Sequence, residues 1–139
     1  MPARDYAAIA ALAPSARDAF AISDLCAEFD VTARALRFYE DEGLITPQRR
    51  GTQRIYSPRD RARLAWILRG KRVGFSLADI RELIDLYDRG DGRETQRRAT
   101  IAKCRGRIAS LSAQRDDIDA AIDELDAFIA LIDRAPEPA

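Results

Sequence analysis

The chain has 139 residues, with 23 basic and 23 acidic side chains, two cysteines and no histidine. An apolar fraction of 47% is enough for a packed core and argues against global disorder. The lack of histidine excludes histidine acid–base catalysis and most zinc chemistry, and Cys26 and Cys104 provide no disulfide framework. No paired acid–base constellation, phosphate loop or metal cluster is visible, so we expect neither an enzyme nor a bound cofactor.

The N-terminal run "AAIAALA" is short and follows Asp5, which argues against a secretory signal, and no segment is long enough to span a membrane. We therefore expect a cytoplasmic protein in which residues 1–19 form a flexible tail. Charge is unevenly distributed: Arg49 to Arg72 holds nine basic residues against Asp60, whereas Ile108 to the end holds two against eight acids. This uneven distribution of charge predicts an anion-binding head and an acidic stem. The alternative is that two helical surfaces happen to differ in charge.

Residues 22–43 show the pattern of two short helices joined by a tight turn. The apolar positions of "AISDLCAEF" have helical spacing, with Ser23 as the expected N-cap, and Thr32 is the expected N-cap of "TARALRFYEDEG", which ends at Gly43. We expect Leu36, Phe38 and Tyr39 to face inward on the second helix. Its outer side then carries small and basic residues, as an element entering a DNA major groove requires: Ala33, Arg34 and Arg37.

A hairpin and two further helices follow. "PQRRGTQRIYS" alternates around a Gly-Thr turn, which predicts a wing whose Arg49, Arg50 and Arg54 grip phosphates. Ser57 and Ser76 are the expected N-caps of the two helices, the second of which ends at Gly90 and Gly92. Their inward-facing side chains are expected to be Leu64, Ile67 and Leu68, then Leu77, Ile80, Leu83, Ile84 and Tyr87.

The remaining chain predicts one long helix, roughly Glu94 to Asp133. Its seam positions alternate by three and four residues, as in a coiled coil, with one charge among them. They are Ile101, Cys104, Ile108, Leu111, Arg115, Ile118, Ile122, Leu125, Ile129 and Ile132. A helix lying on its own domain is the alternative, but the head is too small to cover so long a stripe, so we favour a homodimer.

The stretch "VTARALRFYEDEGLITPQRRGTQRIYSPRDRARL" resembles the DNA-binding signature of the MerR family of bacterial transcription regulators. The resemblance covers about Phe20 to Gly90. It implies a mainly α protein with a winged helix-turn-helix domain at 20–92, a dimerisation helix at 93–133 forming an antiparallel coiled coil, and a disordered tail at 134–139. It also implies that the dimer binds an inverted-repeat operator in double-stranded DNA and distorts the promoter spacer for RNA polymerase under effector control.

The resemblance also assigns roles to single residues. The residues expected to contact phosphates or brace the wing are Arg37, Tyr39, Arg54 and Tyr56. Those expected to lie nearest the bases are Thr32, Ala33 and Arg34, and Glu40 is expected to tether local structure. Phe38 stands where the family commonly has tyrosine, so a hydrogen bond to the DNA backbone is missing there.

Effector sensing is left open by the sequence. Metal-sensing members use cysteines near the ends of the long helix. The long helix of this chain has one cysteine, Cys104, near its start, and packing in the seam explains that residue. "LRGKRVGFSLADIRELIDLYD" resembles members controlling branched-chain amino-acid and acyl-coenzyme A breakdown, so the expected effector is a small organic metabolite. An architectural DNA binder without an effector and a coiled-coil adaptor without DNA remain the alternatives.

Overall fold

The computed structural model describes residues 11–89, 93–134 and 136. The chain divides into two compact units, Met1–Gln96 and Arg97–Ala139, which we call the head and the stem. The sequence predicted this boundary between residues 92 and 93, four residues before the observed boundary between Gln96 and Arg97. The mainly helical winged helix-turn-helix fold expected from the sequence is confirmed.

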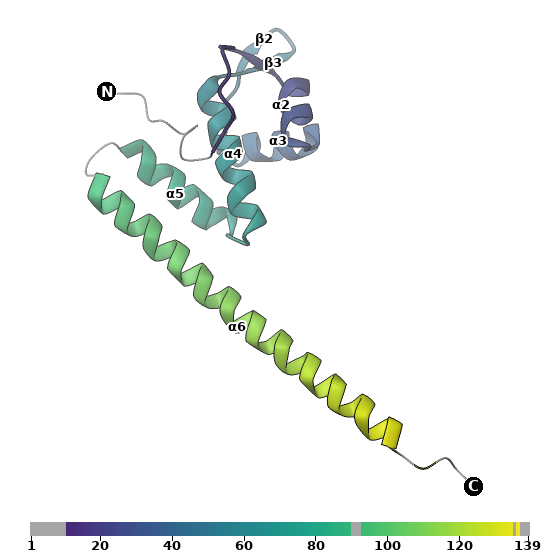
Figure 1. The fold of residues 1–139 in the computed structure, drawn as a ribbon. Helices are drawn as coiled ribbons and strands as arrows, with labels where there is room; N and C mark the ends of the chain where they lie inside the picture. Colours follow the sequence, from purple (N-terminus) through teal and green to yellow (C-terminus); the bar gives the residue numbers. More distant parts are fainter. Residues whose placement is uncertain (1–10, 90–92, 135, 137–139) are drawn as a thin grey trace. The chain divides into compact units, whose positions relative to one another are not determined.

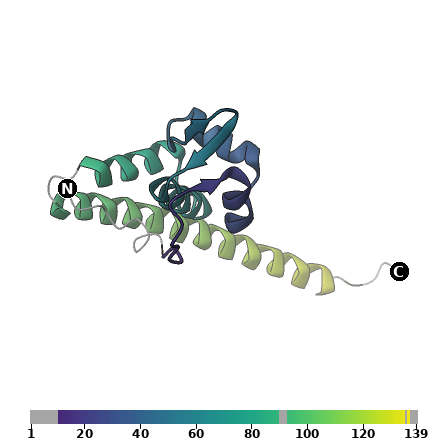
Figure 2. The same cartoon turned by 90° about the horizontal axis from the view of Figure 1, so that it is seen from above.

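A small antiparallel sheet forms the wing of the head (Figure 1, Figure 2). The expected hairpin is present as β2 (Gln48–Arg50) and β3 (Gln53–Tyr56), and Gly51 takes the positive φ of 63° that this turn requires. The strand β1 (Phe20–Ala21) was not expected. It pairs with the other edge of β3, which makes β3 the central strand in the order β1-β3-β2.

The two short helices of the helix-turn-helix are α2 (Ile22–Phe29) and α3 (Ala33–Asp41). The expected cap of α3 is confirmed, since Thr32 Oγ1 accepts a hydrogen bond from the Ala35 N–H at 3.1 Å. The expected cap at Ser23 is wrong. Because β1 pairs as far as Ala21, α2 begins directly after the strand, and the Asp24 carboxylate accepts from the Ala21 N–H at 2.8 Å instead.

Helices α4 (Pro58–Arg72) and α5 (Leu77–Arg89) complete the head. Both serine caps are confirmed: Ser57 Oγ accepts from the Asp60 N–H and Ser76 Oγ from the Asp79 N–H, each at 3.1 Å. The helices approach closely at Gly70, where an added Cβ would lie 2.8 Å from Ile80 Cγ1. The expected end of α5 at Gly90 and Gly92, and the side chain of Tyr87, lie outside the described residues.

The core of the head gathers apolar side chains from the sheet, from α2 to α5 and from the loop after α3. Most expected core residues are confirmed, and Leu68 and Leu77 pack against the core as half-buried residues. The buried cluster is Phe20, Leu25, Leu36, Tyr39, Leu44, Ile45, Tyr56, Leu64, Ile67, Ile80 and Ile84.

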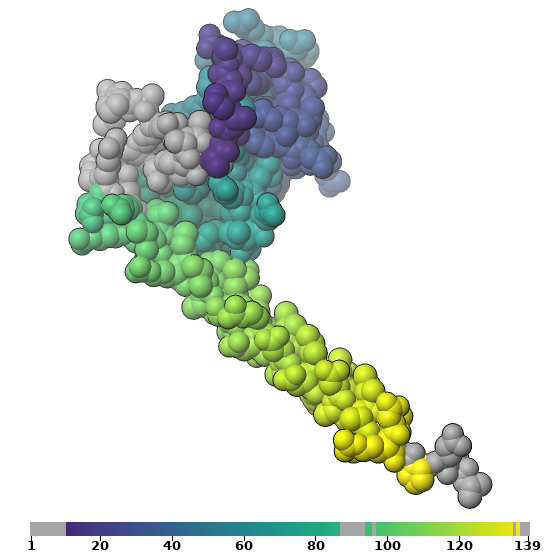
Figure 3. Space-filling view, viewed as in Figure 1, coloured from purple at the N-terminus to yellow at the C-terminus, as the bar shows by residue number. Residues whose placement is uncertain are grey.

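The stem contains the helix α6 (Arg93–Arg134) from Arg97 onward, and the bounds of this helix match the expected helix within one residue at each end. Figure 3 shows it as one continuous rod of side chains, coloured green to yellow. Among the described residues, no helix has the length and apolar character needed to cross a membrane.

Candidate nucleic-acid interface

The outer face of α3 carries exposed cations. Arg34 and Arg37 are exposed, whereas Leu36 and Tyr39 point into the core. The expectation that Phe38 faces inward is wrong, since its side chain is 46% exposed. A helix turns by about 100° per residue, so Phe38 lies roughly opposite Leu36 and joins the arginines on the outer face.

The N-terminal end of α3 is small and polar. Thr32 is exposed but its hydroxyl already caps the helix, and Ala33 is half-buried. This end carries the partial positive charge of the helix dipole, and its first two residues, Ala33 and Arg34, include no bulky apolar side chain that would hinder approach to a base pair.

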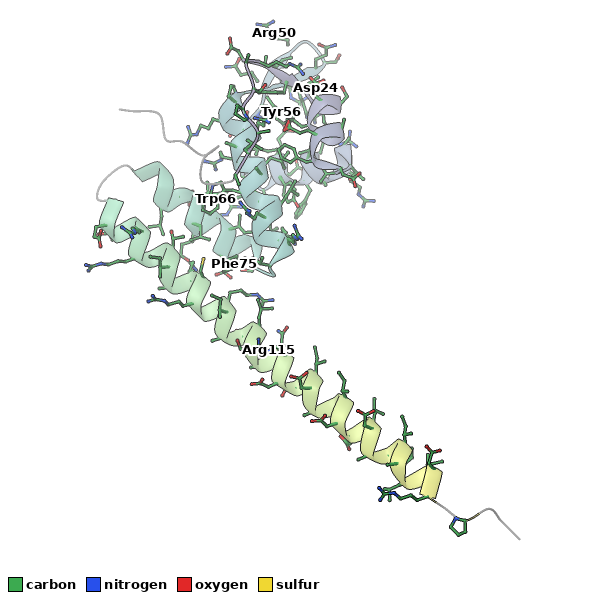
Figure 4. The ribbon with its side chains drawn as sticks, viewed as in Figure 1. Asp24, Arg50, Tyr56, Trp66, Phe75 and Arg115 are labelled. Atoms are coloured by element: carbon green, nitrogen blue, oxygen red, sulfur yellow. The ribbon has the colours of Figure 1, made fainter. Side chains whose placement is uncertain are left out.

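One carboxylate joins α3 to the wing. Glu40 Oε2 accepts a hydrogen bond from Arg54 Nε at 2.7 Å, and its other oxygen lies 3.5 Å from Arg49 Nη2. The hydrogen bond from Arg54 to Glu40 raises the pKa of the guanidinium. The expected role of Glu40 as a local tether is therefore confirmed. The third wing arginine, Arg50, is exposed at the outer end of the hairpin (Figure 4).

The two tyrosines expected at the interface are buried. Tyr39 is almost wholly covered, and Tyr56 is 0% exposed and lies inside the head (Figure 4). Burial raises the pKa of both phenols. Among the described residues, the Tyr56 hydroxyl finds no hydrogen-bond partner. A fully covered side chain cannot contact DNA, so the position of Tyr56 fits bracing of the wing, the second of the two expected roles.

A buried aspartate holds the loop after α3 against α4. The Asp60 carboxylate accepts hydrogen bonds from the Thr46 and Ser57 N–H groups, both at 3.0 Å. On the same loop, the Leu44 carbonyl accepts from Arg63 Nε at 2.7 Å. These bonds fix the start of the wing relative to the helix-turn-helix.

A second tether was not foreseen from the sequence. The buried Arg61 of α4 donates to both carboxylate oxygens of Glu28 on α2, at 2.6 to 2.9 Å, and to the Ala13 carbonyl at 2.9 Å. The guanidinium carbons of Arg17 and Arg61 lie 5.1 and 5.5 Å from the centre of the Phe20 ring. Ala13 and Arg17 of the expected tail thus contact α4, α2 and β1. The partners are 33 and 48 residues apart, and no local pattern announces such a contact.

The stem presents an exposed apolar stripe. The expected seam positions are exposed, as is Arg115 (Figure 4). Phe128 and Leu131 are also exposed and lie outside the seam, although the run "FIALI" in the sequence signals them. In the described part of the chain, no group of three or more Cys, Asp or Glu side chains is arranged to hold a metal ion.

Comparison with known proteins agrees with this architecture. Residues 20–86 match the model of the MerR HTH family regulatory protein, and residues 61–128 match the MerR DNA-binding model. The HTH-type transcriptional regulator CueR of Salmonella typhi is 30% identical over 103 residues, covering 70% of this chain and 75% of that protein.

Two solved structures share the fold. A MerR-family transcriptional regulator from Bacillus cereus has a TM-score of 0.66 at 25% identity, covering 87% of each chain. HiNmlR, a MerR-family regulator lacking the sensor domain and bound to promoter DNA, has a TM-score of 0.60 at 22% identity, covering 84% of this chain and 88% of its own.

The chain belongs to the MerR family of helix-turn-helix regulators. It is a DNA-binding transcription regulator, in a family that is not enzymatic and whose members bind promoter DNA as dimers.

Proposed function

We propose that the protein acts in the cytoplasm as a homodimer at an inverted-repeat operator. The observation that carries this proposal is the set of cations that the fold leaves exposed on two adjacent elements. Arg34 and Arg37 of α3 and Arg50 of the wing are exposed and make no ion pair among the described residues. Cations on a helix and a neighbouring hairpin suit the two tasks of a DNA reader, base recognition and phosphate binding.

The two tasks predict two mutant phenotypes. Arg34→Ala should relax base preference and cost about 1–3 kcal/mol on the best site. Arg50→Ala should weaken all sequences alike, because a phosphate contact carries no base information. Titration of an operator and of scrambled duplexes across salt concentrations separates these effects. A nearly flat dependence of affinity on salt would instead favour a coiled-coil adaptor.

The seam permits an antiparallel pairing of two stems, the orientation that the family resemblance implies. Setting Ile101 against Ile132 of the partner subunit aligns Ile108 with the partner's Leu125. The same register places Cys104 opposite the partner's Ile129, so every seam position meets another seam position. A parallel pair would instead bring the two Cys104 thiols together.

The native cysteine provides the test of orientation. In the antiparallel register the two Cys104 residues are about 37 Å apart along the axis, beyond the reach of a disulfide. Oxidation should therefore leave a Cys26→Ser background uncrosslinked and should crosslink its Ile129→Cys derivative. Adding Cys104→Ser to that derivative should abolish the crosslink. Crosslinking of the background itself would establish a parallel pair.

We further propose that the operator lies in a promoter spacer, that the dimer distorts it for RNA polymerase, and that a small organic metabolite controls the distortion. Promoter DNA in the HiNmlR structure supports the promoter operator, and the resemblance of residues 68–88 to members that control acyl-coenzyme A breakdown supports the metabolite. Footprinting with and without acyl-coenzyme A thioesters or Cu⁺ tests them. A response to the metal alone would overturn the metabolite assignment.

A further inference from the structure

The wing holds two like charges directly opposite each other. Arg49 on β2 and Arg54 on β3 are register partners in the antiparallel pair, so both side chains stand on the same face of the hairpin. Like charges in such a pair repel and destabilise it. Both arginines reach Glu40 on α3, which therefore acts as their shared counter-ion.

The geometry at Glu40 leaves most of each guanidinium available. Arg54 uses Nε for Glu40, and no hydrogen bond from its two terminal nitrogens is found among the described residues. A guanidinium has five N–H donors, so Arg54 can keep Glu40 and still donate to a phosphate. Its side chain is only 22% exposed, which restricts the directions in which those donors point.

We propose that Glu40 is a positioning residue that aims Arg49 and Arg54 at the DNA backbone and locks the wing to α3. Its carboxylate offsets the repulsion between the two cations and orders them before DNA arrives, so less conformational entropy is lost on binding. This role rests on the proposed operator binding. The opposite role is competition, in which Glu40 withholds both arginines from phosphate.

The two roles predict opposite changes in operator affinity when Glu40 is replaced. If Glu40 positions the arginines, Glu40→Ala lowers operator affinity by on the order of tenfold, the loss expected when a charged hydrogen bond is removed. The slope of log affinity against log salt becomes shallower by about one for each phosphate that the arginines no longer neutralise. If Glu40 competes, Glu40→Ala binds more tightly and with a steeper slope.

Two further variants make the test decisive. Glu40→Gln keeps an acceptor for Arg54 without the charge, so positioning predicts a smaller loss than Glu40→Ala, and competition predicts tighter binding. Asp41→Asn is the matched control, because it removes one negative charge from the same turn of α3. Asp41 is exposed, and no hydrogen bond joins it to the wing in the described head.

Operator titration across salt, with thermal melting of each variant, completes the experiment. If Glu40→Ala fails to fold, the operator affinities of Glu40→Gln and Asp41→Asn are compared instead. The sign of the change in affinity on Glu40→Gln then distinguishes the two roles. Tighter binding of Glu40→Gln, or identical behaviour of all three variants, overturns the positioning role. Failure of the unmodified protein to bind any operator would instead overturn the proposed function.

Discussion

The head and the stem use apolar residues in opposite ways. The head buries eleven large side chains in one cluster drawn from its helices, the sheet and the loop after α3. In the described stem no side chain is buried, although its seam is almost wholly apolar. A single helix has no second surface to cover its stripe, so the stem depends on a partner, whereas the head completes its core within one chain. Stability should therefore depend on protein concentration only through the stem.

Charged residues in the seam should disrupt the pairing of the stems and leave the head folded, which is the largest effect that we expect. Ile118→Glu combined with Ile122→Glu places four carboxylates in the dimer seam and should leave a folded monomer. A monomer binds through one half-site only, so affinity for the full inverted repeat should fall by on the order of a hundredfold or more. Sedimentation and operator titration measure both effects. Ala120→Glu with Ala127→Glu, on the outer face of the same helix, is the control, and a persistent dimer in the seam variant would contradict the pairing.

A core deletion in the head should act at any protein concentration. Leu64 is fully buried in α4, and Leu64→Ala should lower the free energy of unfolding by about 2–5 kcal/mol. Leu131 is 67% exposed on the stem and lies outside the seam, so Leu131→Ala should change stability little. Chemical denaturation at two protein concentrations compares them. An equal loss in Leu131→Ala would show that the partner covers this residue.

Arg115 should limit the stability of the stem pair. In the antiparallel register it meets Ile118 of the partner subunit near the centre of the seam, and pairing with an aspartate on the partner helix would fix register at some expense in stability. Arg115→Leu should raise the melting temperature while permitting shifted or larger assemblies that bind operator less well. Sedimentation, thermal melting and operator titration test this. A clean dimer with unchanged affinity would refute the register role, in favour of a side chain that extends to solvent.

Removing the buried hydroxyl of Tyr56 should stabilise the head slightly. This hydroxyl is covered and has no hydrogen-bond partner among the described residues. Tyr56→Phe should therefore be neutral or stabilising by up to about 1 kcal/mol, with operator affinity unchanged because the ring continues to brace the wing. A loss of affinity at unchanged stability would mean that the hydroxyl becomes exposed and contacts DNA.

The smallest expected effect is a dependence on pH at the start of α2. The hydrogen bond from Arg17 lowers the pKa of Asp24 below its ordinary value of 3.8. Because the pKa of Asp24 is lower in the folded than in the unfolded protein, this carboxylate stabilises the fold at pH values above its pKa in the unfolded chain. The contribution disappears as pH falls through its pKa in the folded protein. Asp24→Asn should melt slightly below the unmodified protein at neutral pH, and the two should converge well below pH 3.8. A constant difference at all pH values would contradict the ionic origin.

Many structural features of this protein follow from residues that are close together in the sequence. The caps at Thr32, Ser57 and Ser76, the turn at Gly51 and the seam of α6 depend on residues within a few positions of each other. Local hydrogen bonds and helical periodicity therefore sufficed to place the hairpin, the starts of α3, α4 and α5, both ends of α6, and the exposed stripe. The arginines of α3 were placed correctly for the same reason.

Other features were decided only by tertiary structure, because the groups concerned meet across long stretches of chain. β1 exists because β3 offers it an edge, and that strand in turn displaced the expected cap at Ser23. Tyr56 was expected to contact DNA or brace the wing, and only packing against the core shows that it is covered. The bond from Arg61 to Ala13 spans 48 residues. No periodicity can encode a contact whose partner is chosen by how separate elements pack.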